Sequence, residues 1–170
     1  MLKEVYDFNK IRNGFKYDRE LEIAMYAEEV REFFDANTTA ERLDALVDCS
    51  YVRMGTMLKL AYNNKSVNDL PYERNVEQIM VSILVEEIGQ ELFDRVIRLA
   101  EEIVCDCNSK KLIKTNKNGK VVKGDIPDAT KLIDEMLKDK FEERDAILNA
   151  QAKKQQEIFD SYTQDSTKNP

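Results

Sequence analysis

Residues 27–52 read AEEVREFFDANTTAERLDALVDCSYV and predict two helices joined by a short connection. The first helix is expected over about residues 18–36, where side chains recur at helical spacings of three and four. Those side chains are Leu21, Met25, Glu28, Glu32 and Ala36. Thr39 is a good N-cap for the second helix, which the pattern extends to about residue 62. So short a connection makes the two helices antiparallel neighbours.

Acidic residues follow the inward-facing stripe of both expected helices. On the second helix, Asp44 and Asp48 share one stripe with Tyr51 and Gly55. Counting away from the connection in both directions brings Glu32 level with Asp44, and either Glu29 or Glu28 level with Asp48. We call the five carboxylates the acidic seam: Glu28, Glu29, Glu32, Asp44 and Asp48.

Like charges along such a seam repel and cost several kcal/mol unless they are protonated, paired or neutralised by cations. Arg31, Arg42 and Arg53 fall on other faces of the two helices. The seam therefore predicts a divalent cation. Hard oxygen ligands with no His or thiolate nearby favour Mg²⁺, with Mn²⁺ also possible, over zinc. The alternative is an ordinary solvated face whose acids pair with bases along the helix.

The rest of the chain also indicates an all-α protein, a helical bundle. Five glycines and three prolines leave few turn formers in 170 residues, and 35% of the residues are charged. After Pro71, an apolar pattern over residues 76–103 predicts a third helix, which Gly89 bends or divides. A last helix is expected to start after Pro127 and to end near residue 162.

Residues 107–127 differ in character, because lysines gather there with asparagine and glycine. The lysines are Lys110, Lys111, Lys114, Lys117, Lys120 and Lys123. We expect a basic loop before the last helix, with a short hairpin at Asn118-Gly119; the alternative is a solvated connector. We assign residues 1–138 to one domain and residues 139–170 to a polar C-terminal helical extension and tail.

Composition excludes several classes of function. The sequence has no histidine, which removes Ser-His-Asp and Cys-His nucleophiles and His-ligated zinc. A net charge of −7 argues against a nucleic-acid partner. The absence of a long apolar run or a signal-peptide core argues against a membrane, and we expect a cytoplasmic protein. Cys49, Cys105 and Cys107 are expected to be reduced thiols.

Two groups of motifs occur together along the chain. The acidic group is Glu28-Glu29-x-x-Glu32, then Glu41-x-x-Asp44, then Asp48-x-x-Tyr51-Val52-x-x-Gly55-Thr56. The basic group is Asn108-Ser109-Lys110-Lys111, then Asn118-Gly119-Lys120-Val121-Val122-Lys123-Gly124. In order and spacing these motifs resemble the all-α nucleoside triphosphate pyrophosphohydrolase superfamily, which includes the MazG-like and phosphoribosyl-ATP pyrophosphohydrolase-like proteins. The resemblance covers roughly residues 20 to 125.

The resemblance implies an Mg²⁺-dependent enzyme that hydrolyses a (d)NTP to (d)NMP and pyrophosphate, for nucleotide-pool control or housecleaning. It implies metal ligation by Glu29, Glu32, Asp44 and Asp48. Glu28 is then the catalytic candidate, as the base for the attacking water. The residues expected to contact the substrate are Tyr51, Asn108, Lys111, Lys120 and Lys123. The resemblance also implies a homodimer or homotetramer.

The acidic pair of the second helix departs from the superfamily's Glu-x-x-Asp pattern. Glu41 with Asp44 fits the spacing, whereas alignment on Asp48 leaves Ala45 at the Glu position and makes Asp44 the candidate substitute. Both registers stay open. Two other functions also stay open: a noncatalytic helical oligomer or interaction protein, and the phosphoribosyl-ATP pyrophosphohydrolase of histidine biosynthesis. The extended C-terminal helix argues against the latter.

Overall fold

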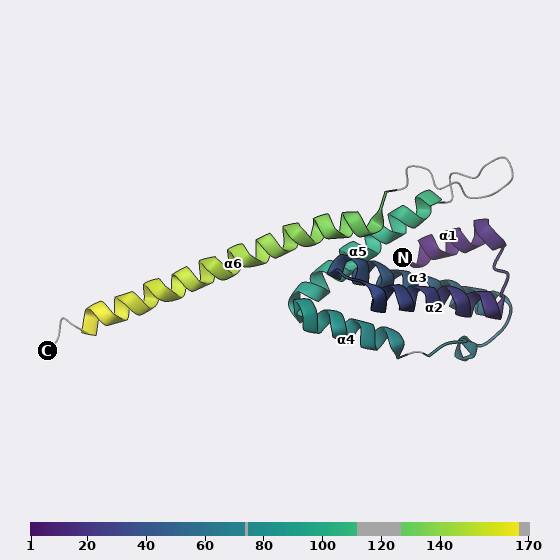
Figure 1. Cartoon of the computed structure of the whole chain (residues 1–170), viewed down its shortest axis with the longest axis horizontal. Coiled ribbons are helices and arrows are strands. Elements are labelled where there is room, and N and C mark those ends of the chain that lie inside the picture. Colours follow the sequence, from purple (N-terminus) through teal and green to yellow (C-terminus); the bar gives the residue numbers. More distant parts are fainter. Residues whose placement is uncertain (74, 112–126, 167–170) are drawn as a thin grey trace. The chain divides into compact units, whose positions relative to one another are not determined.

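The computed structural model describes residues 1–73, 75–111 and 127–166, and all regular secondary structure in them is helical (Figure 1). The α-helices are α1 (Leu2–Asn13), α2 (Arg19–Asp35), α3 (Thr39–Tyr62), α4 (Val76–Ile88), α5 (Gln90–Lys111) and α6 (Ala129–Ser166), with a 3₁₀ turn η1 (Val67–Asp69). The expectation of an all-α protein is confirmed for this part of the chain. The hairpin expected at Asn118-Gly119 lies outside the described residues.

The chain forms two compact units, Met1–Met136 and Leu137–Pro170. Helix α6 begins in the first unit and makes up the described part of the second. None of the helices in the described ranges is both long and apolar enough to cross a membrane. Every described residue of the candidate site belongs to the first unit.

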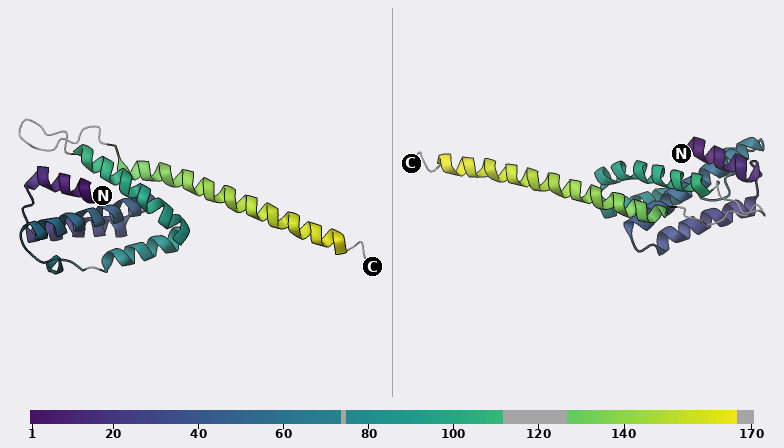
Figure 2. Two further views of the ribbon diagram at one scale, coloured as in Figure 1. Left: turned by 180° about the vertical axis from the view of Figure 1, so that it is seen from behind. Right: turned by 90° about the horizontal axis from the view of Figure 1, so that it is seen from above.

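Helix α3 is the centre of the first unit, because α1, α2, α4 and α5 all pack on it (Figure 2). The largest completely buried side chains include Phe33 of α2, Leu43 and Leu60 of α3, and Met80 of α4. The central position of α3 means that its acidic stripe meets side chains from several other helices.

The start of α3 is fixed by a capping box, in which Thr38 is the N-cap rather than the expected Thr39. The hydroxyl of Thr38 accepts from the backbone N–H of Glu41 at 3.2 Å. In return, Oε2 of Glu41 accepts from the N–H groups of Thr38 at 2.9 Å and Asn37 at 2.7 Å. These bonds satisfy donors that a helix start leaves free, and they use the Glu41 carboxylate for structure.

Gly89 divides the expected third helix into α4 and α5. Its φ of 84° lies in the region that glycine tolerates best, and its N–H donates to the carbonyl of Val85 at 2.9 Å. Helix α5 begins one residue later, at Gln90. The chain can therefore turn between two helices that both pack on α3.

Helix α1 was not anticipated from the sequence. Its Val5 is completely buried and joins Tyr51 of α3 and Cys105 of α5 in one hydrophobic cluster. Gly14, at φ 59°, ends the helix in the left-handed conformation. Helix α1 therefore covers the part of α3 that follows the acidic residues.

Candidate functional site

The acidic seam lies along α2 and α3. Glu29, Asp44 and Asp48 are partly buried, whereas Glu28 and Glu32 are exposed. Glu32 and Asp44 line a hollow of about 280 Å³ at one end of the seam. The other residues around this hollow are Asp35, Ala36, Asn37, Glu41, Ala45 and Thr130.

The charges of neighbouring seam carboxylates act on Glu29 and Asp48. Burial and the charges of the other four carboxylates raise the pKa of Glu29 to about 8. Burial and the charge of Asp44 raise the pKa of Asp48 to about 6, against the opposing effects of Asn108 and Lys111. Burial also raises the pKa of Asp44. Glu29, Asp44 and Asp48 therefore lie near enough for their charges to act on one another.

The two carboxylates of α3 accept hydrogen bonds from different helices. Nδ2 of Asn108, in α5, donates to Oδ1 of Asp48 at 3.1 Å. The hydroxyl of Thr130, in α6, donates to Oδ2 of Asp44 at 2.5 Å. The second oxygen of Asp44, Oδ1, is buried and has no hydrogen-bond partner among the described residues. A buried carboxylate oxygen without a partner is costly, so this atom needs a partner that the described residues do not provide.

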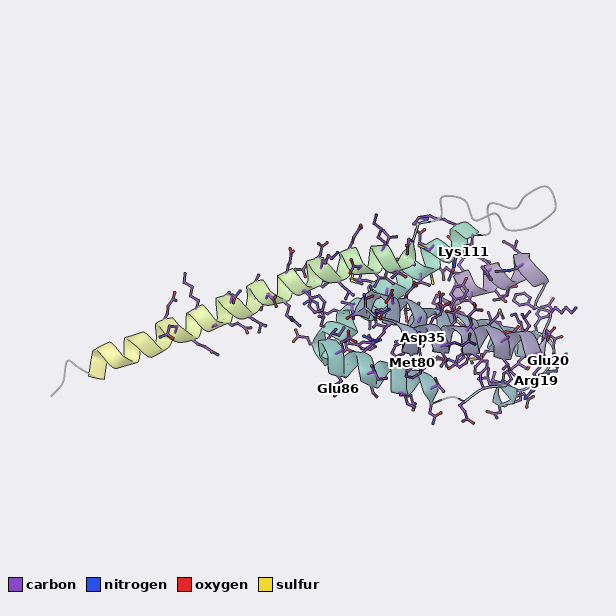
Figure 3. All side chains as sticks on the ribbon, viewed as in Figure 1. Arg19, Glu20, Asp35, Met80, Glu86 and Lys111 are labelled. Atoms are coloured by element: carbon purple, nitrogen blue, oxygen red, sulfur yellow. The ribbon has the colours of Figure 1, made fainter. Side chains whose placement is uncertain are left out.

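The nearby arginines do not neutralise the seam. Arg42 pairs with Glu87 at 2.8 Å, and Arg53 pairs with Glu77 at 2.7 Å. These two arginines therefore pair with acids outside the seam. Lys111 is the last residue of α5 (Figure 3). Its positive charge lowers the pKa of both Asp44 and Asp48.

Glu41, which belongs to one of the two registers open for the acidic pair, is part of the capping box. The two backbone hydrogen bonds to Glu41 hold the pKa of its carboxyl below the usual range, since they favour the charged form. Glu41 is thus committed to the start of α3. Asp44 and Asp48 remain as the pair that acts on Glu29.

Tyr51 lies in the core between α1 and α3. Its side chain is 7% exposed, and its ring packs edge-to-face on Phe8 with centroids 5.7 Å apart. The hydroxyl donates to the carbonyl of Glu4 at 3.5 Å. Of the other expected substrate contacts, Asn108 and Lys111 belong to α5, whereas Lys120 and Lys123 lie outside the described residues.

A second pocket, of about 170 Å³, lies farther along the same helices. Met25 on its wall is about one turn before Glu28 and Glu29 on α2, and Tyr51 is about one turn after Asp48 on α3. Phe8, Asn9 and Arg12 of α1 line its other side. The seam and this pocket therefore follow one stripe of α2 and of α3.

The donor atoms fit a hard divalent cation. The seam offers carboxylate oxygens, the sequence has no imidazole, and burial raises the pKa of all three cysteine thiols. Across residues 1–73, 75–111 and 127–166, however, no three acidic or cysteine side chains form an assembled metal site. Binding an ion would therefore require a side chain such as the exposed Glu32 to turn inward.

Sequence reasoning missed Thr130 and Asn9. Thr130 lies 86 residues from Asp44, so no local pattern connects the two. Asn9 belongs to the unanticipated α1, where its Nδ2 donates to the carbonyl of Val5 at 2.8 Å. The helical spacing of Leu2, Val5 and Asn9 is the signal that would have predicted α1.

Comparisons with models of protein families, with characterised proteins and with solved structures gave no match.

Proposed function

We propose that this protein is an Mg²⁺-dependent nucleoside triphosphate pyrophosphohydrolase, which converts a (d)NTP and water to (d)NMP and pyrophosphate. The observation that carries the proposal is that the partly buried carboxylates Glu29, Asp44 and Asp48, from α2 and α3, lie near enough for their charges to interact. In addition, Oδ1 of Asp44 is buried and has no hydrogen-bond partner among the described residues. The motif resemblance points to the same chemistry. Control of the nucleotide pool is the role that we propose for it.

In this proposal the cation is held by Glu29, Glu32, Asp44 and Asp48. Bound Mg²⁺, or Mn²⁺, would neutralise phosphate charge and make a bound water more acidic. Glu28 is exposed at the edge of the seam, where its carboxylate can accept the proton of the attacking water. Asn108 fixes the orientation of Asp48 through its 3.1 Å hydrogen bond.

The substrate would lie along the stripe that joins the seam to the 170 Å³ pocket. Its phosphates belong at the seam, where Lys111 provides positive charge near Asp44 and Asp48. Its nucleoside end belongs in the pocket, beside Phe8 and Asn9. An aromatic ring and a carboxamide are suited to a flat, polar-edged base.

The assembly that we propose is a bundle of antiparallel helices completed by other copies of the chain, as a homodimer or homotetramer. Phe34 and Ile79 expose 56% and 51% of their surface, so apolar area is available for such contacts. Light scattering at micromolar concentration should give at least twice the 19.8 kDa mass of one chain. A monomer would contradict this part of the proposal.

The decisive experiment is a screen of nucleoside triphosphates with Mg²⁺, with detection of released pyrophosphate. We expect release by the wild type and loss of release in Asp48→Asn, with unchanged helical circular dichroism. Glu86→Gln is the matched control, because Glu86 is an exposed acid on α4 (Figure 3). If no triphosphate yields pyrophosphate, the proposal is wrong and a noncatalytic helical protein is favoured. Release from phosphoribosyl-ATP alone would indicate the biosynthetic alternative.

A further inference from the structure

We propose that Thr130 is a positioning residue for Asp44: its hydroxyl holds Oδ2 of the carboxylate and leaves Oδ1 available to a divalent cation. The inference rests on the proposed function, because it takes Asp44 as a metal ligand. It also goes beyond that function, since neither the sequence motifs nor the resemblance assigns any role to Thr130.

The hydrogen bond from Thr130 gives the two carboxylate oxygens of Asp44 different roles. Oδ2 of Asp44 accepts the Thr130 hydroxyl at 2.5 Å, and Oδ1 has no hydrogen-bond partner among the described residues. Both residues line the 280 Å³ hollow together with Glu32, another proposed ligand. A carboxylate that binds a metal is commonly oriented by a hydrogen bond from a residue that is not itself a ligand. Thr130 provides such a hydrogen bond to Asp44.

The start of α6 holds Thr130 firmly enough for this role. Asp128 caps the helix: its Oδ1 accepts from the N–H of Lys131 at 3.2 Å, and its carbonyl accepts from the N–H of Leu132 at 3.1 Å. Ile133, three residues after Thr130, is completely buried. Threonine also has few side-chain rotamers in a helix, so the Thr130 hydroxyl can occupy only a few positions.

The test measures the affinity of the full-length protein for Mn²⁺ alone, by the electron paramagnetic resonance of free Mn²⁺. Thr130→Val keeps the shape of the side chain and removes the hydroxyl, and we expect it to weaken Mn²⁺ binding about tenfold or more. Thr130→Ser restores the hydroxyl and should bind as the wild type does. If the valine variant does not fold, Thr130→Ala and Thr130→Ser provide the same comparison.

Thr39→Val is the matched control, because it also removes a hydroxyl that donates to a carboxylate on another helix, that of Glu87. It should leave Mn²⁺ affinity unchanged. Full affinity in Thr130→Val, with affinity lost in Asp44→Asn, would overturn the role of Thr130 and leave the proposed function standing. Full affinity in Asp44→Asn as well, or no binding by the wild type, would overturn both.

Discussion

Lys59 and Glu22 form an ion pair that is almost completely enclosed between α3 and α2. Nζ of Lys59 lies 2.6 Å from Oε1 of Glu22, and the two side chains retain only 4% and 1% of their exposure. The hydroxyl of Thr56 donates to the other carboxylate oxygen at 2.7 Å. The pair therefore holds α2 against α3 near the 170 Å³ pocket, which Lys59 also lines.

Removing one partner of this pair should be costly. We expect Lys59→Met to lower the free energy of unfolding by about 3–5 kcal/mol, because it leaves the Glu22 carboxylate buried without a counter-charge. The double variant Glu22→Leu/Lys59→Met should regain most of that loss. Urea unfolding of both variants checks the prediction. A single variant as stable as the wild type would mean that the pair is solvated in solution.

The stability of the metal-free protein should depend on pH through Glu29. The pKa of this residue rises from 4.5 to about 8 on folding, so the folded state binds the proton more tightly. Its stabilising contribution is therefore complete below pH 4.5 and is lost as the pH rises toward 8.

Glu29→Gln removes this dependence. In the presence of a chelator at pH 8.5, the variant should be more stable than the wild type by about 1–3 kcal/mol, whereas at pH 4 the two should be nearly equal. Urea unfolding at the two pH values measures the difference. Glu86→Gln, an exposed control on α4, should show no such change. A constant difference across pH would contradict burial of Glu29 among like charges.

Gly55 allows α1 to approach α3 closely. A Cβ at this position would lie 3.0 Å from Nδ2 of Asn9, which is anchored by its hydrogen bond to the carbonyl of Val5. We expect Gly55→Ala to destabilise the protein by about 1 kcal/mol or more. In an Asn9→Ala background the same substitution should cost less, as thermal unfolding would show. Equal costs in the two backgrounds would exclude the contact with Asn9 as the cause.

Lys111 should contribute to substrate binding through its charge. We expect Lys111→Ala to raise the Michaelis constant for the triphosphate, and to do so more strongly at low salt than at high salt. Its turnover number at saturation should change less. Steady-state kinetics at two ionic strengths checks this, with Lys131→Ala as a control at an exposed lysine of α6. An unchanged Michaelis constant at low salt would show that Lys111 does not contribute to substrate binding.

Local signals explain what the sequence predicted well. The structure has α2 at Arg19–Asp35 and α3 at Thr39–Tyr62, close to the expected ranges, because helical periodicity and capping residues act over a few positions. The same periodicity placed Asp44 and Asp48 on one stripe. That placement required only the geometry of a helix and a short connection to the preceding one.

Contacts between distant parts of the chain could not be predicted in this way. The bond from Thr130 to Asp44 depends on where α6 begins in space, and the approach of Asn9 to Gly55 depends on the docking of α1. The engagement of Glu41 in the capping box likewise required the structure, since the sequence pattern alone left Glu41 free to pair with Asp44. Tertiary packing, rather than local preference, determines these features.

The buried cysteines make the protein convenient for site-specific labelling. Cys49, Cys105 and Cys107 are all enclosed, and the raised pKa of their thiols keeps them out of the reactive thiolate form. The native chain should therefore react slowly with maleimides. A cysteine introduced at exposed Glu86 would take up a fluorophore or spin label selectively, without prior removal of the natural thiols.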